Sequence, residues 1–234
     1  MTTAKRPSGL PVRRSGRKAR LVAAALAAAL VGGMVIPGLP ALAGAEAFPT
    51  PSIAPVAWEI DLEYRLPRRI VVEVPGQSPK AYWYMVYTVT NNTDEELFFV
   101  PAIEMMTKDS QLVRANRNIP AAAFNAIQQR TRSLSLVRPQ RMADTLRVGQ
   151  DEARSSVAIW EEPSQEMGTF EIYFGGLSGE VVTLKAPDGS DLKDEDGNPI
   201  RVRKTRQLRF KVRGDEYLPE QDQVVKVKDT WVMR

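Results

Sequence analysis

The stretch Tyr82–Thr90, YWYMVYTVT, decides the fold class of this chain. Most of its residues are aromatic or β-branched, which favours a β-strand, and the turn-forming run NNTD follows it at once. Successive side chains of a strand point to opposite faces. One face therefore holds Trp83, Met85, Tyr87 and Val89, and the other holds Tyr82, Tyr84, Val86 and Thr88. We predict a central strand whose first set of side chains faces a core.

The same period of two recurs on both sides of this stretch. The further predicted strands are 59–63, 70–74, 97–106, 157–160, 169–174, 207–213 and 224–232. Pro101 predicts a bulge or an edge position inside one of them. By contrast, Pro120–Arg130, PAAAFNAIQQR, has a helix-starting proline and predicts a short helix that crosses an end of the sheet. Many short strands with one minor helix predict an all-β, antiparallel β-sandwich domain over residues 56–234.

The composition removes two large groups of chemistry. The chain has 234 residues, and none of them is a cysteine or a histidine. Disulfides, thiolate nucleophiles, imidazole bases and histidine metal ligands are therefore excluded. We expect no cofactor.

The N-terminus has the order of a secretory signal peptide. Residues 1–20 carry seven basic side chains and no acid, and residues 21–43, LVAAALAAALVGGMVIPGLPALA, carry no charge. Small residues stand at the −3 and −1 positions of a cleavage between Ala43 and Gly44. The alternative is a retained membrane anchor, because 23 uncharged residues are long enough to span a bilayer. Residues 44–55 contain three prolines and predict a linker.

The whole excess of positive charge lies in this leader, residues 1–43. The whole chain has 32 basic and 28 acidic residues, a net charge of +4. Without residues 1–43, 25 basic and 28 acidic residues remain, a net charge of −3. An exported domain of this charge is not expected to bind nucleic acid. Membrane contact is expected only through the leader, if it is not cleaved.

Two segments resemble immunoglobulin-like domains of exported bacterial proteins. Met85–Thr93, MVYTVTNNT, is similar to their "V-x-V-x-N-x-T" strand and turn. Leu146–Asp151 followed by Val157–Trp160 is similar to their "L-x-P-G-E … G-V-x-I-F" segment, although Val148 and Gln150 replace Pro and Glu. The chain also resembles uncharacterised exported proteins of planctomycete-like bacteria. The resemblance covers roughly residues 80–180, implies an immunoglobulin-like β-sandwich and export, and carries over no catalytic residue.

Tyr82 and Tyr84 form the first candidate site. Exposed aromatic rings stack on sugars, so these two side chains are candidate carbohydrate-binding residues. The alternative is core packing, which a central strand of a sandwich requires and which we expect for Trp83. Exposure of the two tyrosines decides between these interpretations.

A basic run forms the second candidate site. It has seven positive charges in 13 residues without an acid: Arg201, Arg203, Lys204, Arg206, Arg209, Lys211 and Arg213. Such a run can bind an acidic polysaccharide or a lipid headgroup. The alternative is a solvated hairpin, in which the acidic turn 188–196 partly neutralises the run and the charges protect a strand edge.

The acidic turn and the later glutamates are weaker candidates. With Gly197 at position 6 of an EF-hand loop, Leu192 and Arg203 would occupy ligand positions 1 and 12, so we predict a hairpin and no metal site. A glycosidase would need two opposed carboxylates. The available ones are Glu161, Glu162, Glu171 and Glu180.

These patterns predict an exported, non-catalytic protein in the periplasm or outside the cell. Its expected role is that of a structural or protein-interaction module of the cell envelope. A carbohydrate- or polyanion-binding module is the alternative, and a carboxylate-based hydrolase is the third. The expected partner is an envelope protein or a polysaccharide.

Overall fold

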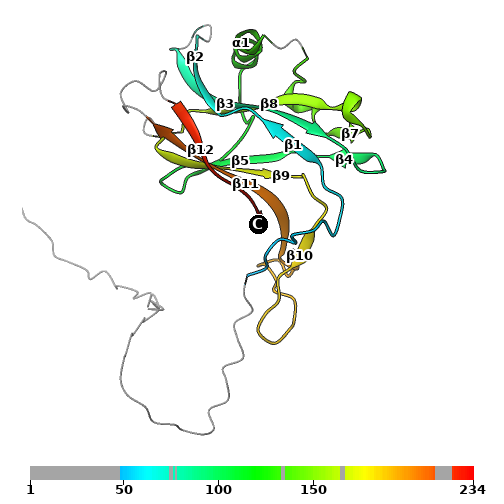
Figure 1. The fold of residues 1–234 in the computed structure, drawn as a ribbon. Coiled ribbons are helices and arrows are strands. Elements are labelled where there is room, and N and C mark those ends of the chain that lie inside the picture. The colour runs from blue at the N-terminus through cyan, green and yellow to red at the C-terminus, as the bar shows by residue number, and fades with distance from the viewer. Residues whose placement is uncertain (1–47, 74–75, 77, 133–134, 164–166, 214–222) are drawn as a thin grey trace, which may run out of the picture. The chain divides into compact units, whose positions relative to one another are not determined.

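The computed structural model describes residues 48–234 apart from 74–75, 77, 133–134, 164–166 and 214–222. The predicted signal peptide, its cleavage point at Ala43 and Gly44, and the start of the predicted linker lie outside the described residues. The described strands form antiparallel sheets and are joined by one α-helix, which confirms the all-β prediction (Figure 1). Within these described ranges, no helix is long and apolar enough to cross a membrane.

Strand β3 (Lys80–Thr90) is the centre of the first sheet and contains the whole stretch that decides the fold class. It pairs with β1 (Asp61–Tyr64) and then β2 (Arg68–Val72) along one edge. It pairs with β8 (Arg154–Glu161) along the other edge. All three pairings are antiparallel, so the central position predicted for this strand is confirmed.

Strand β11 is the centre of the second sheet. It pairs with β12 and β9 on its two edges, β5 and β6 follow beyond β9, and β10 pairs with the first residues of β11. These strands are β5 (Ala102–Met106), β6 (Leu112–Arg114), β9 (Thr169–Gly175), β10 (Val181–Thr183), β11 (Arg201–Arg213) and β12 (Gln223–Met233). A small separate sheet pairs β4 (Leu97–Phe99) with β7 (Asp144–Leu146). Single 3-10 turns cover Pro139–Arg141 and Gln150–Glu152.

The predicted strand 97–106 is in fact two strands. It divides at Val100 and Pro101, where β4 ends and β5 begins. β4 pairs with β7, whereas β5 lies between β9 and β6 and is not an edge strand. Proline has no amide hydrogen to donate, so Pro101 stands where the chain leaves one sheet for another.

The two large sheets enclose a shared core, so the fold is a β-sandwich. Trp83, Met85, Tyr87 and Val89 of β3 belong to this core, as the alternation predicts. Phe170, Ile172 and Phe174 of β9 and Leu208 and Phe210 of β11 complete it. The rings of Tyr87 and Phe174 meet edge to face with centroids 4.9 Å apart.

Helix α1 (Ala121–Thr131) covers the other face of the first sheet (Figure 1). Pro120 precedes it in an extended conformation, as the helix-start pattern predicts. Its buried residues Phe124 and Ile127 pack in a second core with Tyr82 and Tyr84 of β3. The prediction that the helix crosses an end of the sheet is therefore wrong, because its apolar stripe is needed to cover apolar side chains in the middle of β3.

The two segments that carry the family resemblance meet at Asn91, which is fully buried. Its amide nitrogen donates to the carbonyl oxygens of Glu95 at 2.8 Å and Leu146 at 2.9 Å. Its Oδ1 accepts from the amide of Thr93 at 3.0 Å, and its own carbonyl accepts from Gly149 at 2.9 Å. One side chain thus closes the turn after β3 and joins it to the end of β7.

Residues 48–60, which we call the strap, run beside β10 and the turn before it (Figure 1). The amide of Ile60 donates to the carbonyl of Leu177 at 2.8 Å. The amide and hydroxyl of Ser52 both donate to Glu180 Oε1 at 2.9 Å. Contacts with the sandwich therefore begin at Ser52, inside the predicted linker.

Candidate functional site

The alternation of β11 divides the predicted basic run between two faces. Leu208 and Phe210 point into the core and are fully buried. Side chains at odd-numbered positions of the strand therefore point away from the core. Arg203, Lys211 and Arg213 are exposed on that outer side.

Pairing between strands brings further cations to the same surface. Lys228 of β12 lies opposite Arg209, and Arg234 exchanges two main-chain hydrogen bonds with Arg203 at 2.7 and 3.0 Å. Arg114 of β6 lies opposite Glu104 of β5. We call this outer surface of the second sheet the basic face. Its cations are Arg114, Arg203, Arg209, Lys211, Arg213, Lys228 and Arg234, and its acids are Glu104 and Glu171.

Glu171 is held by a hydrogen-bond network on the basic face. Its Oε1 lies 2.5 Å from Arg209 Nη2. Its Oε2 accepts from the Tyr173 hydroxyl at 2.5 Å and from Gln207 Nε2 at 2.7 Å. Burial by itself raises the pKa of Glu171, but these hydrogen bonds outweigh it and lower the pKa below its ordinary value. The Glu171 carboxylate is thus ionised, and both of its oxygens have bonding partners.

Glu104 is the other acid of the basic face, and it is also paired with arginines. Its carboxylate lies 2.7 Å from Arg234 Nη1 and 3.1 Å from Arg114 Nε. The guanidinium of Arg234 also stacks over the ring of Tyr173, 4.3 Å from its centroid. Both acids of the basic face therefore have basic partners of their own.

Four cations of the basic face have no acidic partner among the residues that the structure describes. Arg203, Lys211, Arg213 and Lys228 are exposed and form no ion pair with any residue in the described ranges. The connection from β11 to β12, residues 214–222, contains four acids in the sequence and lies outside those ranges. The described part of the basic face therefore carries a clear excess of positive charge.

Lys204 belongs to the opposite side of β11, and its side chain is only 1% exposed. Its Nζ lies 2.6 Å from Glu59 Oε1 and 3.2 Å from Glu180 Oε2, and donates to the Ser52 carbonyl at 2.8 Å. Burial by itself lowers the pKa of Lys204, but its bonds to the two carboxylates raise the pKa above its ordinary value. Arg206, on the same side, is paired with Asp229. The predicted run of seven surface cations therefore includes two that anchor structure.

The acidic turn between β10 and β11 is a hairpin, as predicted. Asp194 Oδ1 accepts two main-chain amides, one of them from Asn198 at 2.8 Å. A hydrogen bond from Lys185, with smaller contributions from the charges of Lys193 and Arg201, lowers the pKa of Asp191. Arg201 pairs with Thr183 of β10 at the base of this hairpin. No group of three acidic side chains that could hold a metal ion exists within the residues that the structure describes.

Tyr82 and Tyr84 are not exposed, which favours core packing over the interpretation of these two residues as a sugar-binding surface. They are 1% and 2% exposed, because helix α1 and its Phe124 and Ile127 lie over them. Trp83 lies in the core as expected, and its indole N–H donates to Glu162 at 3.1 Å.

Each of the four glutamates considered for hydrolysis has a basic partner. Glu161 lies 2.8 Å from Lys80, and Glu162 lies 2.6 Å from Arg69. Glu171 and Glu180 are paired with Arg209 and Lys204 as described above. All four carboxylates are therefore held in ion pairs.

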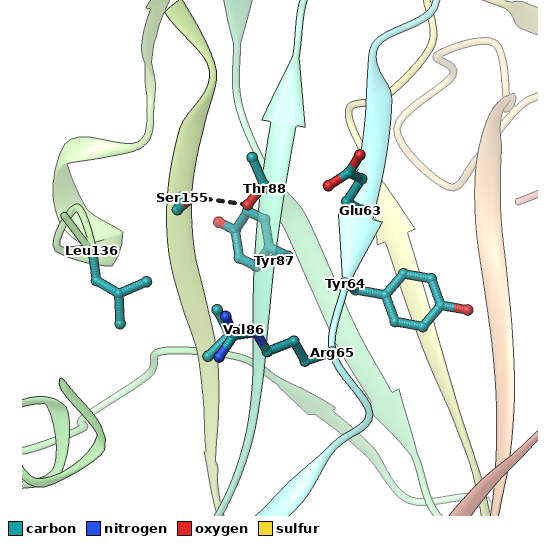
Figure 2. A pocket seen from close by; sticks show the side chains of 8 residues that line it. All are labelled: Glu63, Tyr64, Arg65, Val86, Tyr87, Thr88, Leu136 and Ser155. Carbon is teal, nitrogen blue, oxygen red and sulfur yellow. Dashed lines mark hydrogen bonds between the residues drawn. The ribbon is translucent and has the colours of Figure 1, made fainter. Parts of the chain in front are cut away.

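A cavity of about 190 Å³ lies over the outer side of β3, next to Leu136 (Figure 2). The hydroxyls of Thr88 and Ser155 bond to each other at 2.8 Å in its lining. Glu63 is the one carboxylate among its lining residues, so it offers no opposed carboxylate pair. Two further cavities, of about 310 and 190 Å³, lie beside the strap and beside Pro101. None of these three is lined by a residue of the basic face.

Comparisons of the chain with models of known protein families, with curated proteins and with solved structures found no match.

Proposed function

We propose that this chain is an exported, non-catalytic, immunoglobulin-like β-sandwich module that binds an anionic polysaccharide of the cell envelope through its basic face. The observation that carries this proposal is the set of four exposed cations on one open sheet surface, each without an acidic partner in the described ranges. The two acids of that surface are already bonded by arginines. An anion that approaches this surface therefore meets uncompensated positive charge.

The form of the surface favours a polymer over a small ligand. Side chains on one face of a sheet recur about every 7 Å along a strand and about 4.8 Å between strands. The basic face thus repeats its cations along an extended area, whereas small ligands bind in concave pockets. Two of its four uncompensated cations, Arg203 and Arg213, are arginines, and the planar guanidinium of arginine binds carboxylate groups through two parallel hydrogen bonds.

Other features support the remaining parts of the proposal. The basic, apolar and small-residue order of residues 1–43 supports export. The antiparallel sandwich, and the contact of Asn91 with Leu146 between the two segments of the resemblance, support an immunoglobulin-like module. The cation bonded to each candidate glutamate supports a role in binding rather than catalysis.

Charge reversal on the basic face tests the proposal. The variant combines Arg203→Glu, Lys211→Glu, Arg213→Glu and Lys228→Glu in the chain from Gly44 onward. We expect the parent chain to be retained on immobilised heparin and polygalacturonate at low salt and to elute as salt screens exposed charges. The variant should pass through both columns. Equal retention of parent and variant would overturn the proposal.

A matched variant separates the basic face from overall charge. It reverses four exposed cations outside that face, Arg65, Arg68, Arg117 and Lys193, and so changes the net charge equally. We expect it to keep most of its retention. Parallel loss in both variants would show that only net charge matters, which also contradicts a specific binding face.

A further inference from the structure

The strap presents an uncharged, apolar surface to solvent. Phe48–Ala57, FPTPSIAPVA, contains no charged residue. Within it Phe48 is 59% exposed, Ile53 is fully exposed and Val56 is 69% exposed. Three large apolar side chains are thus exposed within nine consecutive residues, and exposed apolar surface of this kind marks interaction sites.

Buried polar contacts hold the strap in this position. Ser52 lies between Phe48 and Ile53 in the chain, and it is bonded to both Glu180 and Lys204. Trp58 is fixed against Gly179 so closely that a Cβ at Gly179 would lie 2.6 Å from the indole nitrogen. The exposed side chains of the strap are therefore held outward on a fixed segment.

The apolar surface continues onto the neighbouring hairpin. The cavity of about 310 Å³ beside the strap is lined by Phe48 together with Val182, Leu184 and Leu192. Leu192 is itself 40% exposed. We call Phe48, Ile53, Val56 and Leu192 the apolar ledge.

The chain that precedes Phe48 indicates what the ledge contacts. Only residues 44–47 separate Phe48 from the uncharged segment 21–43. Four residues span at most about 14 Å when fully extended. The uncharged segment is expected to enter a bilayer during export, whether or not it is cleaved afterwards. The ledge therefore begins within reach of the membrane surface.

We infer that the apolar ledge is a lipid contact that seats the domain on the membrane through which it is exported. This contact is separate from polysaccharide binding and uses none of the residues of the basic face. The nearby hairpin, residues 184–200, carries five acids against the two bases Lys185 and Lys193, so its net negative charge would be repelled by anionic lipids. The ledge is thus suited to the zwitterionic surface of a bilayer.

Vesicle flotation of the chain from Gly44 onward tests this inference. Zwitterionic phosphatidylcholine vesicles remove charge attraction by the basic face from the measurement. We expect the parent chain to float with the vesicles at both low and high salt. The variant Phe48→Ser, Ile53→Ser, Val56→Ser should lose about tenfold in partitioning, because three apolar contacts with lipid are removed.

Two control variants distinguish the ledge from other exposed surfaces in the flotation experiment. The variant Phe98→Ser, Val100→Ser, Val227→Ser removes three other exposed apolar side chains and should float like the parent. The four-fold charge reversal of the basic face should also float like the parent while it loses heparin retention. The inference is overturned if the parent does not float, or if the strap variant floats as well as the parent. If the parent does not float but crosslinks to an envelope protein, and the strap variant loses that crosslink, the ledge binds a protein partner instead.

Discussion

Lys204 Nζ lies 2.6 Å from Glu59 Oε1, and this ion pair joins β11, which carries the basic face, to the strap, which carries the apolar ledge. Glu180 and the carbonyl of Ser52 complete the surroundings of the ammonium group. The two surfaces proposed for binding therefore share one buried polar anchor.

Substitution of Lys204 by methionine should destabilise the domain by about 3 kcal/mol, because it leaves two carboxylates near each other without their cation. The strap should also become open to proteases. Urea unfolding and limited proteolysis measure the two effects. Arg203→Met, an exposed neighbour on the other side of β11, should change stability by less than about 0.5 kcal/mol. Equal effects of the two substitutions would contradict the anchor.

The stability of the domain should fall in acid through Glu180. Burial by itself raises the pKa of this carboxyl, but hydrogen bonds from Ser52 and the charge of Lys204 lower the pKa below its ordinary value. The unfolded chain therefore binds this proton more readily than the folded chain. The stabilisation is complete above the ordinary glutamate pKa of about 4.3 and is lost as the pH falls through the lower folded-state value. Urea unfolding between pH 3 and 7 should show a shallower pH dependence in Glu180→Gln than in the parent; identical slopes would count against this carboxyl.

Replacement of Glu171 by glutamine should strengthen polyanion binding while it weakens the fold. The substitution removes one negative charge from the basic face and frees Arg209 for an anionic ligand. Elution from heparin should shift to higher salt, and the free energy of unfolding should fall by about 1–3 kcal/mol. Glu161→Gln, on the first sheet, should leave the elution position unchanged. Earlier elution of the Glu171 variant would be the wrong sign for a basic binding face.

Removal of the Asn91 side chain should destabilise the fold by about 3 kcal/mol. Asn91→Ala would remove the hydrogen bonds of this side chain to main-chain groups of Glu95, Leu146 and Thr93, of which the bond to Leu146 is buried. Asn92→Ala is the matched control, because the bond of Asn92 to Asp61 is exposed. It should cost less than about 0.5 kcal/mol. Urea unfolding of both variants decides whether Asn91 has this role.

Elements that depend on local sequence pattern could be predicted from the sequence. The aromatic alternation of β3 correctly assigned Trp83 to the core, and the proline-led run correctly predicted α1. The apolar character of both faces of β3 was also a signal that both are covered. Helix α1 provides that cover, and it buries Tyr82 and Tyr84.

Local sequence pattern alone does not show which residues belong to the basic face. The alternation of β11 already grouped Lys204 with Leu208 and Phe210, which indicated an inward side chain. Lys228 and Arg114 join the face only through the register of β12 on β11 and of β6 on β5. Register is set by pairing between segments distant in sequence, so these residues could not be assigned from the run itself.

The strap determines which contacts bear tension first when the domain is tethered at its N-terminal side. Tension applied through the tether reaches Ser52 before it reaches β1, since Ser52 comes first in the chain. The bonds of Ser52 to Glu180 and Lys204 therefore bear the load ahead of the ladder between β1 and β3. The hydrogen bonds of Ser52 thus protect the sandwich from tension, and force reaches the sheet only after they break.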